Sequence, residues 1–141
     1  MLGVSKKSTQ LHKNFKVLVA EDDPTGQYLI KIVLNKMQIE NVTVVENGLE
    51  AWNLLAEEST KFDLVISDWS MPMGTGLELL QEMREQEIST PFLMITGRGL
   101  VESAVEAKMF GVTSFMTKPY SPFQLIDKIK ELLKIKASPL I

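Results

Sequence analysis

The chain has 141 residues, no cysteine, one histidine and a net charge of −3 at pH 7. This length predicts one domain whose core needs no disulfides, and the composition excludes disulfide frameworks, thiolate metal sites and cysteine nucleophiles. The acidic balance argues against a general nucleic-acid binder, and no apolar run approaches the roughly 20 residues of a membrane helix.

The N-terminal stretch, residues 1–14, is polar and basic, with Lys6, Lys7, Lys13 and the single histidine, His12. It lacks the apolar run of a signal peptide, so we expect a flexible arm on a cytoplasmic protein without membrane insertion. Because His12 lies in this arm, a Ser-His-Asp triad in the core is not expected.

Short β-branched and aliphatic runs follow, and they alternate with longer segments of helical spacing. Strands are expected at residues 16–20, 41–45, 63–67, 91–95 and 113–116. Their nearly continuous apolarity is typical of strands buried on both faces, as in a parallel sheet.

Between these runs, apolar residues recur at steps of three and four, and charged residues occupy the other faces. The recurring residues are Leu29, Ile32, Val33 and Met37; Ala51, Leu54 and Leu55; Leu77, Leu80 and Met83; Val101, Ala104, Val105 and Met109; and Leu125, Ile126, Ile129, Leu132 and Leu133. Asp23-Pro24 and Ser121-Pro122 are good helix starts, and Gly111 is a plausible helix end. Five strands alternating with five helices indicate a doubly wound α/β domain with helices on both faces of the sheet.

Polar residues stand where four of the strand-like runs end. Glu21 and Asp22 follow the first run, and Asp68 follows the third. Thr96 follows the fourth run and Lys118 the fifth. Parallel strands end at one edge of their sheet, where α/β proteins bind ligands, so we expect these groups to form one site.

The chemistry of this set favours a cation and a phosphoryl group. Crowded carboxylates such as Glu21, Asp22 and Asp68 repel one another, and Mg²⁺ removes that repulsion while leaving positions for phosphate oxygens. Lys118 can pair with Asp68 and then with a phosphoryl oxygen, while Thr96 offers a hydroxyl. A carboxylate can attack phosphorus to give an acyl phosphate, and Asp68 is the best candidate for that nucleophile.

The ordered set of strand-end motifs resembles the receiver domain of two-component response regulators, in particular the CheY-like single-domain members. The motifs are Val19-Ala20-Glu21-Asp22-Asp23, Asp68-Trp69-Ser70-Met71-Pro72, Ile95-Thr96-Gly97 and Lys118-Pro119-Tyr120. The resemblance runs from about residue 15 to residue 136. It implies a receiver domain over residues 15–137 with a short tail over 138–141, and the strand order 2-1-3-4-5.

The resemblance also implies roles for single residues. Asp68 would be the phosphoacceptor. Glu21 and Asp22 would hold Mg²⁺ together with Asp68 and the backbone carbonyl of Ser70. Asp22 would be the more direct ligand, with Glu21 acting mainly through water. Thr96 would turn its hydroxyl toward the phosphoryl group.

The remaining implied roles concern the fifth strand and its surroundings. Lys118 would pair with the phosphoryl group, and a cis bond would join Lys118 to Pro119. Phe115 would be a switch aromatic that moves with Thr96, and plain core packing is the alternative role for this residue. Movement of Thr96 and Phe115 would change the surface of the fourth helix, fifth strand and fifth helix, where a downstream protein target would bind. The phosphoryl group would come from a sensor histidine kinase or a phosphotransfer protein.

Several positions depart from the family pattern or admit a simpler role. Thr75, before Gly76, stands where similar domains often have an acid, and Phe115 lacks the hydroxyl of a switch tyrosine. Ser70 and Arg98 would flank the path of an attacking water and tune the lifetime of the acyl phosphate.

Two neighbours of the expected site have plainer interpretations. Asp23 is interpreted as a helix cap rather than a ligand. Trp69 is expected to be a partly exposed aromatic without a chemical role.

Three other functions stay open at this point. The first is a binding module of the same fold that is never phosphorylated. The second is an aspartyl-nucleophile phosphatase, although such enzymes need a general acid where this chain has Ser70. The third is a flavodoxin-like cofactor carrier, although Glu21-Asp22-Asp23-Pro24 would repel a phosphate in the absence of metal.

Overall fold

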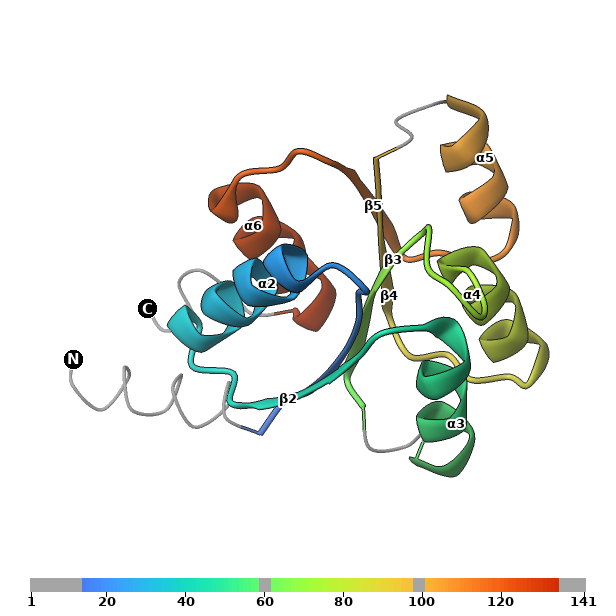
Figure 1. The fold of residues 1–141 in the computed structure, drawn as a ribbon, viewed down its shortest axis with the longest axis horizontal. Helices are drawn as coiled ribbons and strands as arrows, with labels where there is room; N and C mark the ends of the chain where they lie inside the picture. Colours follow the sequence, from blue (N-terminus) through green and yellow to red (C-terminus); the bar gives the residue numbers. More distant parts are fainter. Residues whose placement is uncertain (1–13, 59–61, 98–100, 135–141) are drawn as a thin grey trace.

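Five parallel strands form one central sheet in the order β2-β1-β3-β4-β5. The structure is a computed structural model that describes residues 14–58, 62–97 and 101–134 (Figure 1). The strands are β1 Lys16–Ala20, β2 Asn41–Val45, β3 Leu64–Asp68, β4 Phe92–Thr96 and β5 Ser114–Thr117. The predicted α/β class and the strand order implied by the resemblance are both confirmed.

The first two strands have the predicted bounds, and the other three lie one residue later. Trp69 N donates to Ile95 O at 2.8 Å, and Lys118 N donates to Thr96 O at 2.7 Å. The strand pairing therefore continues into the polar residues at the strand ends. The prediction stopped earlier because it followed side-chain polarity, whereas the pairing uses backbone groups only. Asp68 and Thr96 are consequently the last residues of their strands.

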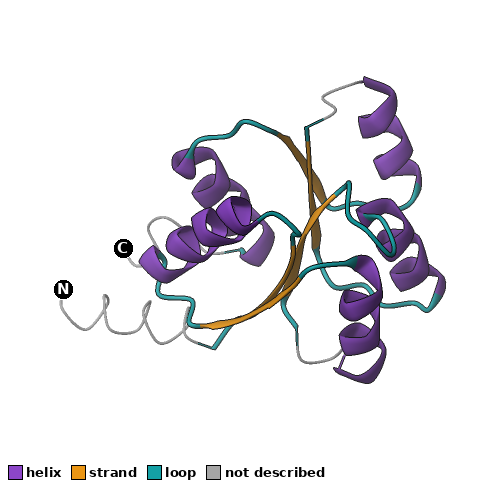
Figure 2. Ribbon diagram, viewed as in Figure 1, coloured by secondary structure: helices purple, strands orange, loops and turns teal. Residues whose placement is uncertain are grey.

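Helices cover both faces of the sheet (Figures 1 and 2). They are α2 Pro24–Lys36, α3 Gly48–Glu58, α4 Gly76–Glu85, α5 Val101–Met109 and α6 Pro122–Leu133. One face carries α2 and α6, and the other carries α3 and α4, with α5 beside α4 (Figure 1). In the described part of the chain, no helix has the length and apolarity needed to span a membrane.

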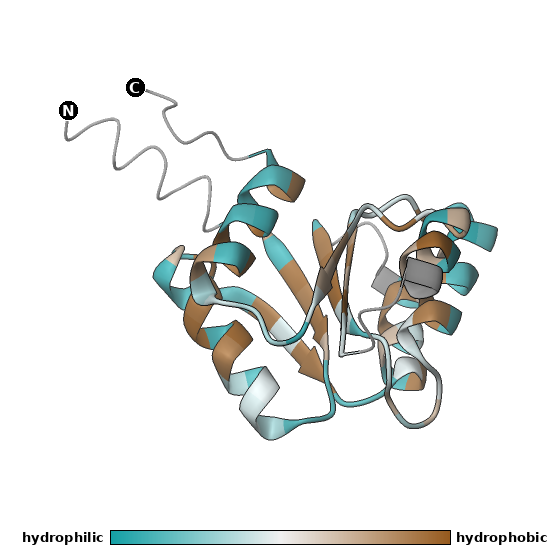
Figure 3. Cartoon of the chain, turned by 90° about the horizontal axis from the view of Figure 1, so that it is seen from above, coloured by the Kyte–Doolittle hydropathy of each residue, from teal (hydrophilic) through white to brown (hydrophobic). Residues whose placement is uncertain are grey.

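The core is divided by the sheet into two apolar clusters, because successive strand residues point to opposite faces. The strand residues facing α2 and α6 are Val17, Val19, Leu64, Ile66, Leu93 and Ile95. Those facing α3 and α4 are Leu18, Ala20, Val65, Phe92 and Met94. All of these side chains are buried, which is why the strands read as continuous apolar runs (Figure 3). Because helices cover both faces of the sheet, the strands and the residues at their ends are held in place.

The helix starts follow the predicted capping chemistry. The Asp23 side chain accepts a hydrogen bond from Gly26 N at 3.0 Å, which confirms its interpretation as a cap. Ser121 begins α6 in a reciprocal capping box with Gln124. Thr75, one of the departures from the family pattern, forms the same device with Glu78 at the start of α4. At this position the hydroxyl and N3 glutamate satisfy backbone groups of the first helical turn.

The helix expected from the fourth set of recurring apolar residues is present as α5, but part of its apolar face is exposed. Val105 and Met109 recur at helical spacing, but their exposed fractions are 52% and 75%. Among the side chains of α5 that the structure describes, that of Ala107 packs into the core and is fully buried. Apolar recurrence finds a face of a helix, but it does not show whether another element covers that face.

A tight approach of α4 to the sheet gives a test of this packing. A Cβ at Gly76 would lie 2.2 Å from the backbone oxygen of Asp68. We expect Gly76→Ala to lower the free energy of unfolding by about 1–3 kcal/mol, because the backbone must shift. At Gly97 a Cβ would have no neighbour within 4 Å, so Gly97→Ala is the matched control, with a change within about 0.5 kcal/mol. Urea unfolding measures both. Equal effects would contradict this account of the packing.

Candidate functional site

The predicted polar groups meet at the carboxyl edge of the sheet. Glu21 follows β1, Asp68 ends β3 and Lys118 follows β5. One carboxylate oxygen from each of Glu21, Asp22 and Asp68 lies within 4.8 Å of the others. The expectation that these groups come together is therefore confirmed, although their residues are separated by up to 97 positions.

Lys118 joins two of the carboxylates. Its Nζ lies 3.2 Å from Oδ2 of Asp68 and 3.3 Å from Oε1 of Glu21. The Lys118 side chain is 33% exposed, whereas those of Asp68 and Glu21 are 10% and 2% exposed. The ammonium thus partly neutralises two nearly buried charges while keeping contact with solvent.

Glu21 is held from several directions. Its backbone N donates to Val45 O at 3.0 Å, and its Oε2 accepts from Asp23 N at 3.1 Å. The Gln27 side-chain amide donates to its backbone oxygen at 2.6 Å. The carboxyl group lies against the backbone of α2, where a Cβ at Gly26 would be only 2.9 Å from it. The missing side chain at Gly26 makes the room that the longer acid needs.

The ionisation of the site reflects this crowding. Burial raises the pKa of Glu21, and the charge of Asp68 adds to the rise. The Asp23 amide and the Lys118 ammonium act in the opposite direction without cancelling it. For Lys118, burial lowers the pKa, but the carboxylates of Asp68 and Glu21 outweigh it and the net direction is upward.

This donor set fits a hard divalent cation. Three carboxylates face one another, and Lys118 forms ion pairs with two of them, Glu21 and Asp68, in the described part of the chain. The negative charge is therefore in excess, and burial together with the charge of Asp68 raises the pKa of Glu21. Carboxylate oxygens near solvent are what Mg²⁺ uses in proteins. Asp22 is exposed and Glu21 buried, so the two acids differ in their access to water.

Thr96 is the last residue of β4, and Ser70 lies two residues after the end of β3. Thr96 is buried at the end of β4, and its backbone oxygen accepts from Lys118 N. Ser70 is exposed in the loop after Asp68. Their roles toward a phosphoryl group or a metal remain predictions. Arg98 lies outside the described residues.

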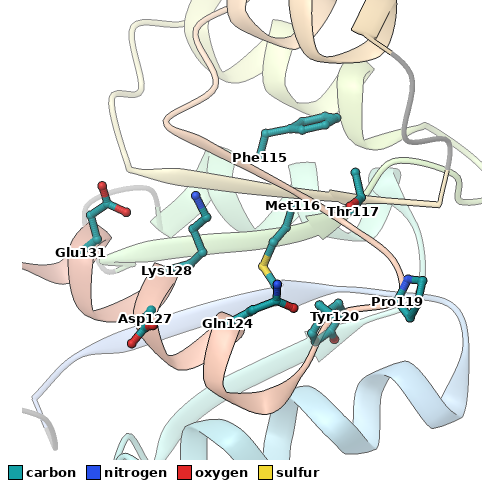
Figure 4. Close-up of a pocket in the computed structure, with 9 residues that line it drawn as sticks. All are labelled: Phe115, Met116, Thr117, Pro119, Tyr120, Gln124, Asp127, Lys128 and Glu131. Carbon is teal, nitrogen blue, oxygen red and sulfur yellow. The ribbon is translucent and has the colours of Figure 1, made fainter.

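Trp69 corrects an expectation, because it is buried with an exposed fraction of 5%. Its ring meets that of Phe115 edge to face, with centroids 6.5 Å apart. Phe115 is half-buried and lies on the opposite side of β5 from Met116 and Gln124 (Figure 4). The sequence expectation relied on the polar neighbours of Trp69, but the large apolar ring is buried all the same. A ring contact therefore links the residue after Asp68 to the strand that carries the expected switch aromatic.

Sequence reasoning missed three residues that shape the site. Gly26 and Gln27 arrange Glu21, and Gly76 brings the start of α4 against the backbone of Asp68. A glycine and a glutamine in the first turn of a helix that follows an acidic strand end are only a weak sequence signal for such a role. Their contacts with Glu21 become clear only in the folded structure. The implied cis bond between Lys118 and Pro119 is present.

Comparisons with known proteins agree with this geometry. The sequence model of the "Response regulator receiver domain" matches residues 17–130. A chemotaxis protein CheY homolog of Campylobacter jejuni is 34% identical over 121 residues, covering 84% of this chain and 92% of that protein. Chemotaxis protein CheY-3 of Vibrio cholerae is 32% identical, covering 88% and 95%. The structure of the Francisella response regulator 1452 receiver domain superposes with a TM-score of 0.78 at 33% identity, covering 86% and 98%.

The first prediction for the site concerns pH. Glu21 has a raised pKa, so its contribution to stability is complete below about 4.5 and is lost as pH rises through the folded-state value. Lys118 opposes that loss by its positive charge. We therefore expect Lys118→Ala to destabilise the protein more at pH 7 than at pH 4, in urea unfolding with a chelator present. Lys31→Ala, on the exposed surface of α2, is the control, and a cost of Lys118→Ala that does not vary with pH would contradict the pairing.

The second prediction concerns the room at Gly26. Gly26→Ala should displace the Glu21 carboxyl group and lower Mg²⁺ affinity by about tenfold, as expected for a residue that orients a ligand. Glu21→Asp in the same chain should restore part of the affinity, because the shorter acid leaves space for the Cβ. Tryptophan fluorescence or calorimetry during Mg²⁺ titration measures the binding. Thr25→Ala is the neighbouring control; wild-type affinity in Gly26→Ala would refute this role.

Proposed function

The chain belongs to the response regulator receiver domain family, and we propose that it is a stand-alone phosphoacceptor that takes a phosphoryl group on Asp68. The donor is a phosphohistidine of a sensor histidine kinase or a phosphotransfer protein. The receiver comprises residues 15–137, between the N-terminal arm and a short tail. Curated CheY relatives matched over 92–95% of their own length support the single-domain part of the proposal.

The proposed transfer has a simple balance. A carboxylate oxygen of Asp68 bonds to phosphorus while the bond from phosphorus to the donor imidazole nitrogen breaks, and that nitrogen keeps the electron pair. Hydrolysis later returns inorganic phosphate and the free carboxylate. A bound Mg²⁺ would supply the positive charge that phosphate oxygens and crowded carboxylates need. Glu21, Asp22, Asp68 and the Ser70 carbonyl would hold it.

The observation that carries the proposal is the position of the Lys118 ammonium, 3.2 Å from the nearly buried carboxylate of Asp68. A cation at this place can transfer its pairing from the carboxylate to a phosphoryl oxygen without a large movement. Thr96 then serves as the hydroxyl that senses the phosphoryl group. Ser70 stands where an aspartyl phosphatase has its general acid, so one reversible modification is favoured over turnover of a substrate.

The proposed output is a changed protein-binding face of α5, β5 and α6. Phe115 lies on this face and contacts Trp69, next to the phosphoacceptor. Exposed apolar side chains of Val105, Met109 and Phe110 lie on and after α5 and are available to a protein target. A groove of about 420 Å³ is lined by residues of β5 and α6 on the same proposed face (Figure 4). The proposed downstream partner is a protein and not a nucleic acid. Phosphotransfer from the kinase would take place in the cytoplasm.

Phosphorylation by a small donor tests the proposal directly. Acetyl phosphate with Mg²⁺ should add one phosphoryl group to the intact protein, as read by mass spectrometry, because Asp68 has both the ammonium and the acidic cluster beside it. Asp68→Asn should give no adduct, and a chelator should prevent it in wild type. Asp127→Asn, on the exposed surface of α6, is the matched control and should react normally.

Two outcomes would count against the phosphoacceptor. Wild-type protein without an adduct would favour the unphosphorylated binding module of the same fold. An adduct that persists in Asp68→Asn would place the reactive group elsewhere in the chain.

A further inference from the structure

A groove of about 330 Å³ lies between α3 and α4, apart from the proposed output face. Its lining includes Leu49 and Trp52 of α3, Met73 of the loop after β3, and Glu78 and Glu82 of α4. It lies on the side of the sheet away from α2 and α6, where α3 and α4 run side by side (Figure 1).

The mouth of the groove exposes large apolar side chains. Met73 is 64% exposed and Leu49 is 48% exposed, while Trp52 is half-buried and packs against the core. Apolar groups that gather around a concavity and are rimmed by polar residues mark interaction sites more often than scattered single ones do. The groove therefore has the composition of a docking site.

The loop that forms one wall is fixed in place. Met73 has a positive φ of 53°, which is uncommon for a residue with a side chain. Its backbone oxygen accepts from Leu49 N at 2.9 Å, and a Cβ at Gly48 would lie 2.4 Å from Gly74 O. The loop and the start of α3 are thus in backbone contact. The strained position holds the apolar side chain of Met73 outward at the mouth of a groove that exists before any partner binds.

The two helices beside the groove are strongly acidic. α3 carries three acids and no base, and α4 carries three acids and one base, which gives a net charge of −5 against −3 for the whole chain. The single base, Arg84, donates to the backbone oxygens of Ile88, Thr90 and Gly111 and is occupied there. Two of these acids, Glu78 and Glu82, line the groove, and its described lining includes no lysine or arginine.

We propose that this groove binds a basic amphipathic helix of a partner protein. One or two large apolar side chains of that helix would fill the space beside Trp52, between Leu49 and Met73. Lysine or arginine one turn away would face Glu78 and Glu82, because complementary charge sets the orientation and speeds association. A second copy of this chain is a poor occupant, since it would place one acidic helix pair against another.

A designed peptide tests this proposal in the unphosphorylated full chain, so its result is separate from the outcome at Asp68. The probe is a fluorescent amphipathic helical peptide of leucine and lysine, and the comparison peptide replaces lysine by glutamate. The first should bind saturably and weaken by tenfold or more between about 50 and about 500 mM salt, because exposed charge pairs are screened. The second should not bind. No saturable binding of the lysine peptide up to about 1 mM would overturn the proposal.

Matched variants locate the binding. Glu82→Lys and Met73→Asn should each reduce affinity at least tenfold, and asparagine keeps the left-handed backbone at position 73 accessible. The controls are Glu85→Lys, on the same helix outside the groove lining, and Tyr28→Gln, on exposed α2; both should leave the affinity within about twofold. Equal losses in the controls would mean non-specific attraction and would overturn the assignment.

The basic arm of the chain itself is the remaining occupant to exclude. A full-length variant with Lys6→Gln, Lys7→Gln and Lys13→Gln removes its charge. Unchanged peptide affinity in this variant supports an external partner. Peptide binding that becomes more than tenfold tighter would show that the arm competes for the groove, and would overturn the proposal of a partner helix.

Discussion

The contact of one ammonium with two carboxylates is the constraint on which the rest of the site depends. Burying a charge costs on the order of several kcal/mol unless it is paired, and Glu21 and Asp68 are both nearly buried. Lys118 meets both within 3.3 Å. Each of the three groups comes from a different strand end, so the pairing requires the order β1-β3-β4-β5 and the buried sheet that keeps these ends level. The parallel sheet thus holds the three charged groups at the short distances that ion pairing requires.

Much of this arrangement could be predicted from the sequence, because strand periodicity and a polar residue at each strand end are local signals. Asp68 and Lys118 could be assigned to one edge without knowing their 3.2 Å contact. Two kinds of feature could not be predicted: space left by a missing side chain, and the burial of a large side chain against a residue far away in the sequence. The free space at Gly26 becomes visible only when α2 is packed against Glu21, and the buried ring of Trp69 contacts Phe115, 46 residues later in the chain. Such features depend on packing between elements, which one sequence does not state.

The exposed apolar residues also show that the sequence does not reveal which residues are covered by packing. The apolar residues that recur at helical spacing in α5 include Val105 and Met109, which are exposed to solvent. Leu49 and Met73 are exposed as well, beside acidic helices on a different part of the molecule. An apolar residue that the core does not use is informative when it belongs to a shaped and charged surface. The receiver fold therefore offers two chemically distinct surfaces, one beside β5 and one between α3 and α4.

The charge balance of the site connects stability with the proposed function. Three carboxylates face one ammonium among the described residues of the cluster, and Glu21 has a raised pKa because it is buried and lies near the charge of Asp68. A phosphoryl group on Asp68 would add negative charge to a site that already has too much, so the modified state needs both a divalent cation and Lys118. If Asp68 is phosphorylated as proposed, the ion pairs of Lys118 would change next to Trp69, whose ring contacts Phe115 of β5. A site that was neutral and relaxed before phosphorylation would have less free energy available to bias a distant surface.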